Sequence, residues 1–330
     1  MARIHREAGS TRYLINGMKP LRGKKPAIYG EVRHFYDHYE KILAETDVTI
    51  GQQYEEMIGR LSTDEAQLDR QLQENIARQT IVVDKNLEEL RGRIAGAENF
   101  FTRFGRRMHY RVVKSRREHH IHSPFAGISS ELKSVQARKV DHIRNKQSAI
   151  QRERDNASAS YQFLKANESY LIGAYGEEAV INALSRLPDN FHVVNDVNLN
   201  FRRALFWNKT GEYIKSCQID HIVVGPTGIF LLETKNWKSS DLGKKSDKLI
   251  WQMNRSRFAL WSYILEYYPS SLERPEIHKL VVSLNNPVVN LKLDRDIDVV
   301  SPKELQGYIS RWKPILSDSE ITRFVGIVNK

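Results

Sequence analysis

The sequence has only one cysteine, Cys217, among its 330 residues. An internal disulfide and a thiolate zinc site are both excluded, and the scarcity of cysteine suits a reducing compartment. Long apolar runs are also missing, since none approaches the roughly 18 to 20 residues of a membrane span. The N-terminal segment lacks the apolar core that a secretory signal needs. We therefore expect a cytoplasmic protein with no membrane partner.

Proline and tryptophan are absent from much of the chain. No proline lies between Pro26 and Pro124 or between Pro124 and Pro188, and all five tryptophans lie in the second half. Stretches without proline permit long helices, because proline removes a helical hydrogen bond and clashes with the preceding turn. We expect three parts, which are a basic N-terminal segment (1–27), a helical region (28–168) and a compact mixed domain (169–330).

The helical region carries a regular apolar pattern. Its apolar residues recur at spacings of three, four or seven between Tyr54 and Ile94, and charged residues fill the gaps. This pattern is typical of a coiled coil or of a long helical hairpin. A four-residue step from Leu72 to Ile76 breaks the heptad, and a second, more polar helix over 128–168 could fold back on the first. We expect these helices to form a homodimer or to bind another partner.

Basic residues crowd the connector between the two helices. The formal net charge of the chain is +11, which is compatible with a polyanionic partner, and aromatic side chains interleave with the basic ones here. We expect this patch to contact nucleic acid, DNA rather than RNA; the alternatives are a solvated turn and a surface that faces an acidic partner. The residues of this basic patch are Arg103, Arg106, Arg107, Arg111, Lys114, Arg116 and Arg117, within the connector 103–122.

The stretch QIDHIVVGPTGIFLLETKNW, residues 218–237, predicts a buried β-hairpin. Two apolar runs flank a Gly-Pro-Thr-Gly turn, and a four-residue connection over Gly225–Gly228 sets the strand pairing. Continued along the ladder, this register brings Asp220 opposite Glu233, with Lys235 on the same face. A three-residue loop would shift the register by one and separate the two carboxylates.

Charged groups at one end of a core hairpin require a partner. Facing carboxylates repel each other in a dry site, and a divalent cation would relieve that repulsion. The ammonium of Lys235 could orient a water or stabilise charge that develops on a phosphate. The helix that Pro188 ends places Glu177 near the middle of its apolar face, so we expect that carboxylate to point inward as well. The alternatives are a surface ion pair at a strand end and a rotated helix that exposes Glu177.

These residues resemble the catalytic core of the PD-(D/E)xK nuclease superfamily. More closely, GAYGEEAVINAL, NDV, QIDHIVVGPTGIFLLETKNW and WQMNRSRFAL resemble the NERD (nuclease-related) domain, over about residues 169–330. The resemblance implies that Asp220 and Glu233 ligate Mg²⁺ or Mn²⁺. It further implies that Glu177 completes the acidic set and that Lys235 assists the attacking water.

The resemblance also implies a role for Gln252, which we expect to open the next helix. It predicts a restriction-endonuclease-like core, in which a mixed β-sheet is flanked by helices, behind the long helical hairpin or coiled coil. The whole chain would then be of the class α + α/β. Strands are expected at FHVVNDVNL, which an irregular polar segment follows, at HKLVVSL and at IDVVS, and a capped helix is expected to start near Ser301.

The leading functional hypothesis is a Mg²⁺-dependent nuclease that hydrolyses phosphodiester bonds, with DNA as the substrate, in bacterial defence or repair. Metal-bound water would attack phosphorus while the cation neutralises the developing charge. The alternative is a non-catalytic nucleic-acid-binding or scaffold protein, in which the domain keeps only the nuclease-like shape and the helices oligomerise.

Overall fold

The computed structural model describes residues 1–236, 239–267, 276–284 and 292–329. The chain forms two compact units, one from Met1–Tyr39 with Asn156–Lys330 and the other from Glu40–Asp155. These units do not follow the boundaries expected from the sequence, because the N-terminal segment packs with the C-terminal part of the chain. The expected hairpin over 218–237 and its flanking elements lie in the first unit, apart from the last residue of that stretch, which is outside the described residues.

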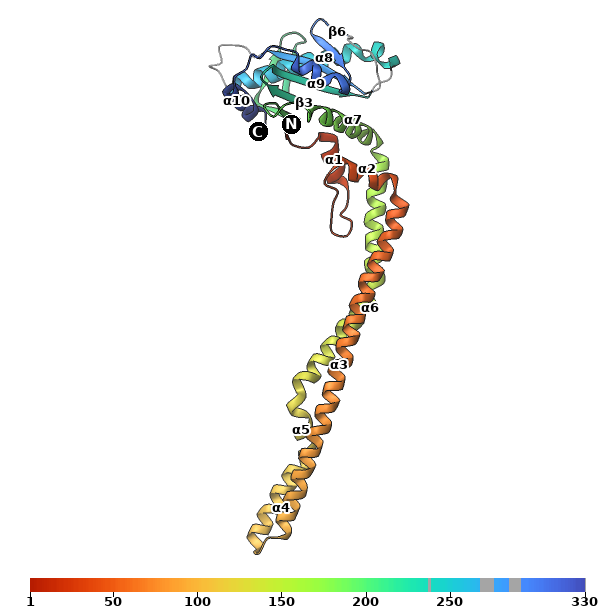
Figure 1. The fold of residues 1–330 in the computed structure, drawn as a ribbon, viewed down its shortest axis with the longest axis vertical. Coiled ribbons are helices and arrows are strands. Elements are labelled where there is room, and N and C mark those ends of the chain that lie inside the picture. The colour runs from red at the N-terminus through yellow and green to blue at the C-terminus, as the bar shows by residue number, and fades with distance from the viewer. Residues whose placement is uncertain (237–238, 268–275, 285–291, 330) are drawn as a thin grey trace. The chain divides into compact units, whose positions relative to one another are not determined.

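The helical unit is an antiparallel hairpin, as the apolar periodicity predicted. Helix α3 (Tyr39–Ala95) runs beside α6 (Ala126–Ala166) (Figure 1). The chain reverses between them through α4 (Phe100–Ser115), α5 (Arg117–His122) and the short 3-10 helix η1 (Ser123–Phe125).

Ion pairs between the two long helices show the antiparallel direction. Glu65 binds Lys139, Glu55 binds Lys146, each at 2.8 Å, and Asp47 binds Arg154. Such exposed pairs each contribute little stability, about 0–1 kcal/mol, so the buried apolar side chains between the helices hold the hairpin together. These include Leu61, Val83 and Val135. The partner of the apolar stripe on α3 is therefore another helix of the same chain.

The first unit is built around one mixed sheet. Within the described residues its strands follow the order β1-β2-β3-β4-β5-β7-β6, with β2, β3 and β4 antiparallel and β4, β5 and β7 parallel. The strands are β1 (Arg3–His5), β2 (His192–Trp207), β3 (Glu212–Gly225), β4 (Gly228–Lys235), β5 (Ile277–Ser283), β6 (Lys292–Asp294) and β7 (Ile297–Val300). This arrangement confirms the expected mixed sheet.

One segment that was expected to be irregular belongs to the sheet. The polar residues that follow FHVVNDVNL continue β2 as far as Trp207, and the chain returns along β3 from Glu212. That prediction was wrong because pairing between the two strands resumes after a register shift between Asn200 and Leu205, where Leu205 pairs with Ile214 and Trp207 with Glu212. Phe201 and Ile214 are buried there and attach the extension to the core.

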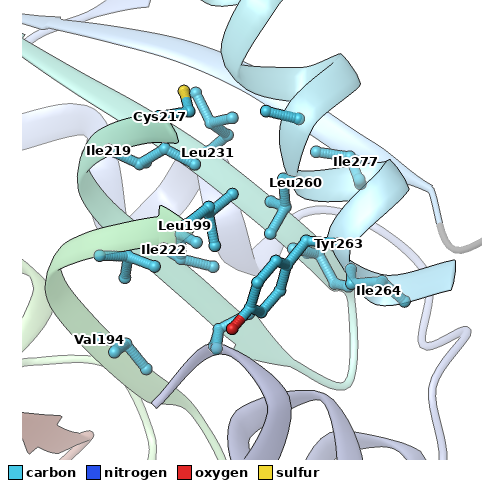
Figure 2. Packing of buried hydrophobic residues seen from close by; sticks show 14 of the residues in the cluster. Val194, Leu199, Cys217, Ile219, Ile222, Leu231, Leu260, Tyr263, Ile264 and Ile277 are labelled. Atoms are coloured by element: carbon cyan, nitrogen blue, oxygen red, sulfur yellow. The ribbon is translucent and has the colours of Figure 1, made fainter. Parts of the chain in front are cut away.

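Helices cover both faces of the sheet. On one face, α8 (Ser239–Tyr267) and α10 (Asp318–Val328) pack on side chains of β2, β3 and β4, and Figure 2 shows Leu260 of α8 beside Leu199. On the other face, α7 (Glu168–Leu184) and α9 (Pro302–Ser310) bury a second cluster. The expected cap of α9 is present, since Ser301 and Glu304 form a capping box. Each fully buried Leu or Ile contributes about 1.5–3 kcal/mol.

The N-terminal segment belongs to the core of this unit. Strand β1 pairs in parallel with β2, and α1 (Gly9–Gly17) and α2 (Tyr29–Asp37) follow it. Leu14 and Val32 are fully buried, and the hydroxyl of Tyr29 donates to the carbonyl of Leu171 on α7 at 3.3 Å. The segment thus extends the sheet and covers the start of α7. Among the described helices, none is both long and apolar enough to cross a bilayer.

Candidate active site at the end of the β3–β4 hairpin

The hairpin has the register that the sequence predicted. Val224 pairs with Ile229 and His221 with Leu232, and Asp220 and Glu233 are the next residues on the two strands. Gly228 closes the turn with a backbone φ of 126°, a conformation that residues other than glycine rarely adopt.

Asp220, Glu233 and Lys235 lie at one end of this hairpin. The Thr234 backbone N–H donates to Asp220 Oδ2 at 2.9 Å, and Lys235 Nζ lies 2.5 Å from Glu233 Oε1. Glu233 is buried, whereas Asp220 and Lys235 are half-buried. The hairpin therefore holds one carboxylate by a backbone amide and the other by the ammonium.

The electrostatics of the site are dominated by burial and by repulsion between carboxylates. Burial, the neighbouring charge of Glu233 and, more weakly, that of Glu177 together raise the pKa of Asp220 to about 8, against the opposing effects of the Thr234 N–H and of Lys235. A carboxyl group with this pKa is mostly protonated near neutral pH, because its surroundings destabilise the charged form. The four charged groups are thus close enough to influence one another.

Glu177 reaches the same site from α7. Ser10 of α1 donates to it twice, from its hydroxyl to Oε1 at 2.6 Å and from its backbone N–H to Oε2 at 3.2 Å. Burial nevertheless raises the pKa of Glu177. The carboxylate on the apolar face of this helix therefore has a hydrogen-bonding partner, which comes from the N-terminal segment.

His221 stabilises the strands rather than the site. Its ring is fully buried, with Nδ1 2.8 Å from Asn195 Oδ1 and Nε2 3.2 Å from Thr234 Oγ1. Burial lowers its pKa to about 3, so the ring is neutral at physiological pH. It links β2 to β4 across β3.

Strands β2 and β3 both break their alternation next to the site. Val194 and Val197 contribute to the same core cluster, and so do Ile219 and Ile222, although residues three apart in a regular strand point to opposite faces. The break on β2 coincides with Asp196, whose φ is 48°. These paired irregularities accompany a group of polar side chains, Asn195, Asp196 and His221, that are buried at one level of the sheet.

Asp196 is an acidic residue of this region that the sequence analysis left out of the site. It is buried, forms an ion pair with Arg12 of α1 and accepts from Gln218 Nε2 at 2.7 Å. A Cβ atom on Gly9 would lie only 2.8 Å from its Cγ, so glycine is needed there. The available signal was a carboxylate inside an otherwise apolar strand, which is costly unless it is paired.

A cavity of about 450 Å³ adjoins these carboxylates. Glu177, Asp220 and Gln252 line it, together with Asp196 and Gln218. Gln252 therefore borders the site as expected, but it does not open a helix. It lies well inside α8, because the polar residues that precede it from Ser239 onward are already helical.

Comparison with known protein families identifies the segment that holds this site. Residues 172–284 match the family model of NERD, the nuclease-related domain. This confirms the resemblance drawn from the sequence motifs, and the NERD segment includes Glu177, Asp220, Glu233, Lys235 and Gln252. The N-terminal segment and the helical unit lie outside it.

A relative of the chain is an uncharacterized protein of Bacillus anthracis. It is 30% identical over 104 residues, which are 31% of this chain and 39% of that protein. The match thus spans well under half the length of either protein. No solved structure gives a significant match.

The acidic groups of the NERD segment suit a hard cation in part. Carboxylate oxygens are the ligands that Mg²⁺ and Mn²⁺ prefer, and the raised pKa of Asp220 indicates that the metal-free protein does not stabilise the charged form of this group. Within the described ranges, however, no three His, Cys, Asp or Glu side chains are grouped as a metal ion would require. Glu233 is engaged by Lys235 and Glu177 by Ser10. Cation binding there would therefore need these contacts to rearrange.

The basic patch lies in the helical unit and is partly engaged in local contacts. Arg103 and Arg106 donate to the carbonyls of Ala97 and Arg93 near the end of α3, at 2.9 and 2.6 Å. Arg117 forms a two-bond ion pair with Asp84. The remaining members expose their side chains on α4 or just after it, and they are Arg107, Arg111, Lys114 and Arg116.

Proposed function

We propose that the NERD segment is a divalent-metal-dependent nuclease that hydrolyses phosphodiester bonds, with DNA rather than RNA as its substrate, in bacterial defence or repair. The observation that carries the proposal is the proximity of the carboxyl groups of Asp220 and Glu233 beside Lys235. In a structural ion pair, an acid is expected to keep a low pKa. Here the pKa of Asp220 is raised to about 8. A bound cation would stabilise the charged form of this carboxyl group.

Each charged residue has a chemical role in this proposal. Asp220 and Glu233 hold Mg²⁺ or Mn²⁺, and Glu177 completes the donor set or orients a water through its second oxygen. When bound, the cation supplies Lewis acidity toward the phosphate and lowers the pKa of water. Lys235, released from Glu233, can donate to the attacking water or to a phosphate oxygen. Gln252 borders the cavity and offers an amide to the substrate.

One observation favours a second candidate, a non-catalytic nucleic-acid-binding domain. No ready metal-binding group of three side chains exists in the part of the chain that the structure describes. In this case the carboxylates would remain bound to Lys235 and Ser10, and the exposed members of the basic patch would provide the affinity for phosphates.

A cleavage assay separates the two candidates. Plasmid, single-stranded DNA and RNA are incubated with the full chain in Mg²⁺, Mn²⁺ or EDTA. Catalysis predicts cleavage that EDTA abolishes and that Glu233→Gln and Lys235→Ala reduce by about 10²-fold or more. Glu178→Gln is the matched control, because Glu178 is the half-buried neighbour of Glu177 on α7. Binding without cleavage in either metal would decide for the non-catalytic domain.

A further inference from the structure

One wall of the cavity beside the carboxylates lies outside the NERD segment. Helix α1 supplies Gly9, Ser10 and Tyr13, and the first turn of α7 supplies Tyr170. The NERD match begins only at residue 172. These four residues of the cavity wall therefore lie outside the family match.

Two tyrosines supply the aromatic rings of that wall. The rings of Tyr13 and Tyr170 stack with their centroids 4.3 Å apart and their planes 26° apart. Phe163 supports Tyr13 at a centroid distance of 5.8 Å, and the Tyr13 hydroxyl donates to Asn167 Oδ1 at 3.3 Å. Each tyrosine still keeps 43% of its surface exposed. An aromatic pair that is held in place and remains open to solvent is suited to bind a flat ligand.

We propose that Tyr13 and Tyr170 form a stacking platform for an unpaired base, so that the cavity receives one nucleotide of a single-stranded segment beside the phosphate to be cleaved. This inference rests on the proposed nuclease function and specifies its substrate. Every base has a π-face, so such a platform binds with little regard to sequence.

The charges that line the cavity favour a base at this wall. Glu177 and Asp220 border the cavity, and ionised carboxylates repel a phosphate at short range. The uncharged part of a nucleotide therefore occupies the cavity, and its phosphate would need a bound cation to approach these carboxylates. The tyrosine pair provides the aromatic surface that the base needs.

The size of the cavity also suits a single base. A volume of about 450 Å³ lies in the range of small-ligand sites. A base inside a duplex is already stacked on both sides, so it must leave the helix before a protein ring can stack on it. Unstacking costs a few kcal/mol in a duplex and much less in a single strand, so single strands, frayed ends and flaps are the favoured substrates.

The test is a binding measurement that does not depend on cleavage. Fluorescence anisotropy is recorded in Mg²⁺ with the Glu233→Gln chain and labelled oligonucleotides of about 12 residues, as single-stranded DNA, as RNA and as a blunt DNA duplex. We expect the DNA single strand to bind at least about 10-fold more tightly than the duplex. Comparison of the DNA and RNA single strands tests whether the binding depends on the sugar. Added to this background, Tyr170→Ala should weaken single-strand binding by about 5- to 150-fold, whereas Tyr170→Phe should retain it.

Tyr175→Ala is the matched control. Tyr175 lies on the same helix and is 59% exposed, but it is outside the cavity wall, so its loss should leave single-strand binding unchanged. Unfolding temperatures of all variants check that each is folded. Equal affinity for strand and duplex, absence of single-strand binding, or equal effects of Tyr170→Ala and Tyr175→Ala would each overturn the proposal.

Failure of the platform and failure of the nuclease function give different results. If the wild-type chain cleaves DNA but Tyr170→Ala binds single strands normally, the platform is wrong and the nuclease stands. If no metal supports cleavage but the single-strand preference depends on Tyr170, the platform stands and the nuclease is wrong.

Discussion

Asp196 of β2 lies in line with Asp220 of β3, at a position where β2 adopts a left-handed backbone with φ of 48°. The pairs on either side of this position are Asn195 with His221 and Val197 with Ile219. Asp196 is neutralised by Arg12, whereas Asp220 accepts from a backbone amide and has a raised pKa. Two aligned carboxyl groups thus differ in their surroundings: Arg12 compensates Asp196 and joins α1 to the sheet, whereas the charged form of Asp220 is destabilised.

Substitution of Gly9 should destabilise the first unit. In Gly9→Ala the new Cβ would lie 2.8 Å from Asp196 Cγ, so α1 or the Asp196–Arg12 pair must shift, at a cost of about 1–3 kcal/mol. Chemical denaturation measures the loss. Gly59→Ala in α3 is the control, since its Cβ would meet nothing within 4 Å; it should stabilise by about 0.5–1 kcal/mol. Equal effects of the two substitutions would contradict the close approach.

Asp220 should make a contribution to the stability of the metal-free protein that falls as pH rises. Its pKa rises from 3.8 to about 8 on folding, so the folded state binds more protons between these values. Its contribution is complete below about pH 4 and is lost as pH rises through about 8. In EDTA, Asp220→Asn should therefore lose less stability than the wild type between about pH 5 and pH 9. Parallel denaturation curves for both proteins across this range would disprove the raised pKa.

Divalent cations should stabilise the protein through the same carboxylates. A ligand that binds only the folded state raises its stability by mass action, by about 2.7 kcal/mol at 100 times its Kd. We expect Mg²⁺ or Mn²⁺ to raise the unfolding temperature of the wild type, and Asp220→Asn to weaken this response. Glu178→Gln should leave the response intact. A shift of the same size in the Asp220 variant would count against the assignment of this ligand.

The exposed arginines of the basic patch should bind phosphates. Arg107 and Arg111 lie exposed on α4, whereas Arg117 is already paired with Asp84. Replacing both exposed arginines by Gln should weaken DNA binding and reduce the slope of log K against log salt by about 2, since each phosphate contact contributes about 0.9. Arg117→Gln should have a smaller effect. An unchanged salt slope in the double variant would place the nucleic-acid contact elsewhere.

The helical unit is expected to associate as a homodimer. Phe100, Phe101 and Phe104 of α4 expose between 58% and 85% of their surface, and burial of such side chains favours association. Light scattering should give about twice the monomer mass of 38.3 kDa, and Phe101→Ser with Phe104→Ser should lower it. A mass near 38.3 kDa at micromolar concentration would reject the dimer.

Local signals were sufficient for the hairpin and for the helices. The Gly-Pro-Thr-Gly turn and the two apolar runs set the register that aligns Asp220 with Glu233, because turn length and alternation are both read from neighbouring residues. The periodicity of 54–94 predicted the long helix α3, and the Ser301–Glu304 spacing predicted the cap of α9. Each of these features depends on residues close together in the chain.

Features that depend on tertiary packing were not predicted from the sequence. The start of α8 well before Gln252 depends on polar residues with weak helical periodicity, and the extension of β2 to Trp207 depends on its pairing with β3. Ser10 and Tyr13 lie in a short segment whose composition says little about where it packs. Propensity is a weak guide where tertiary contacts decide the outcome.

The sequence by itself determined which acidic and basic groups share one end of the β3–β4 hairpin, because strand register follows from a short turn and a period of two. Only the tertiary structure decided that the N-terminal segment joins the sheet, that Ser10 holds Glu177 and that Tyr13 meets Tyr170 beside the cavity. These contacts connect residues more than 150 positions apart. They depend on how whole elements pack, which no local pattern encodes.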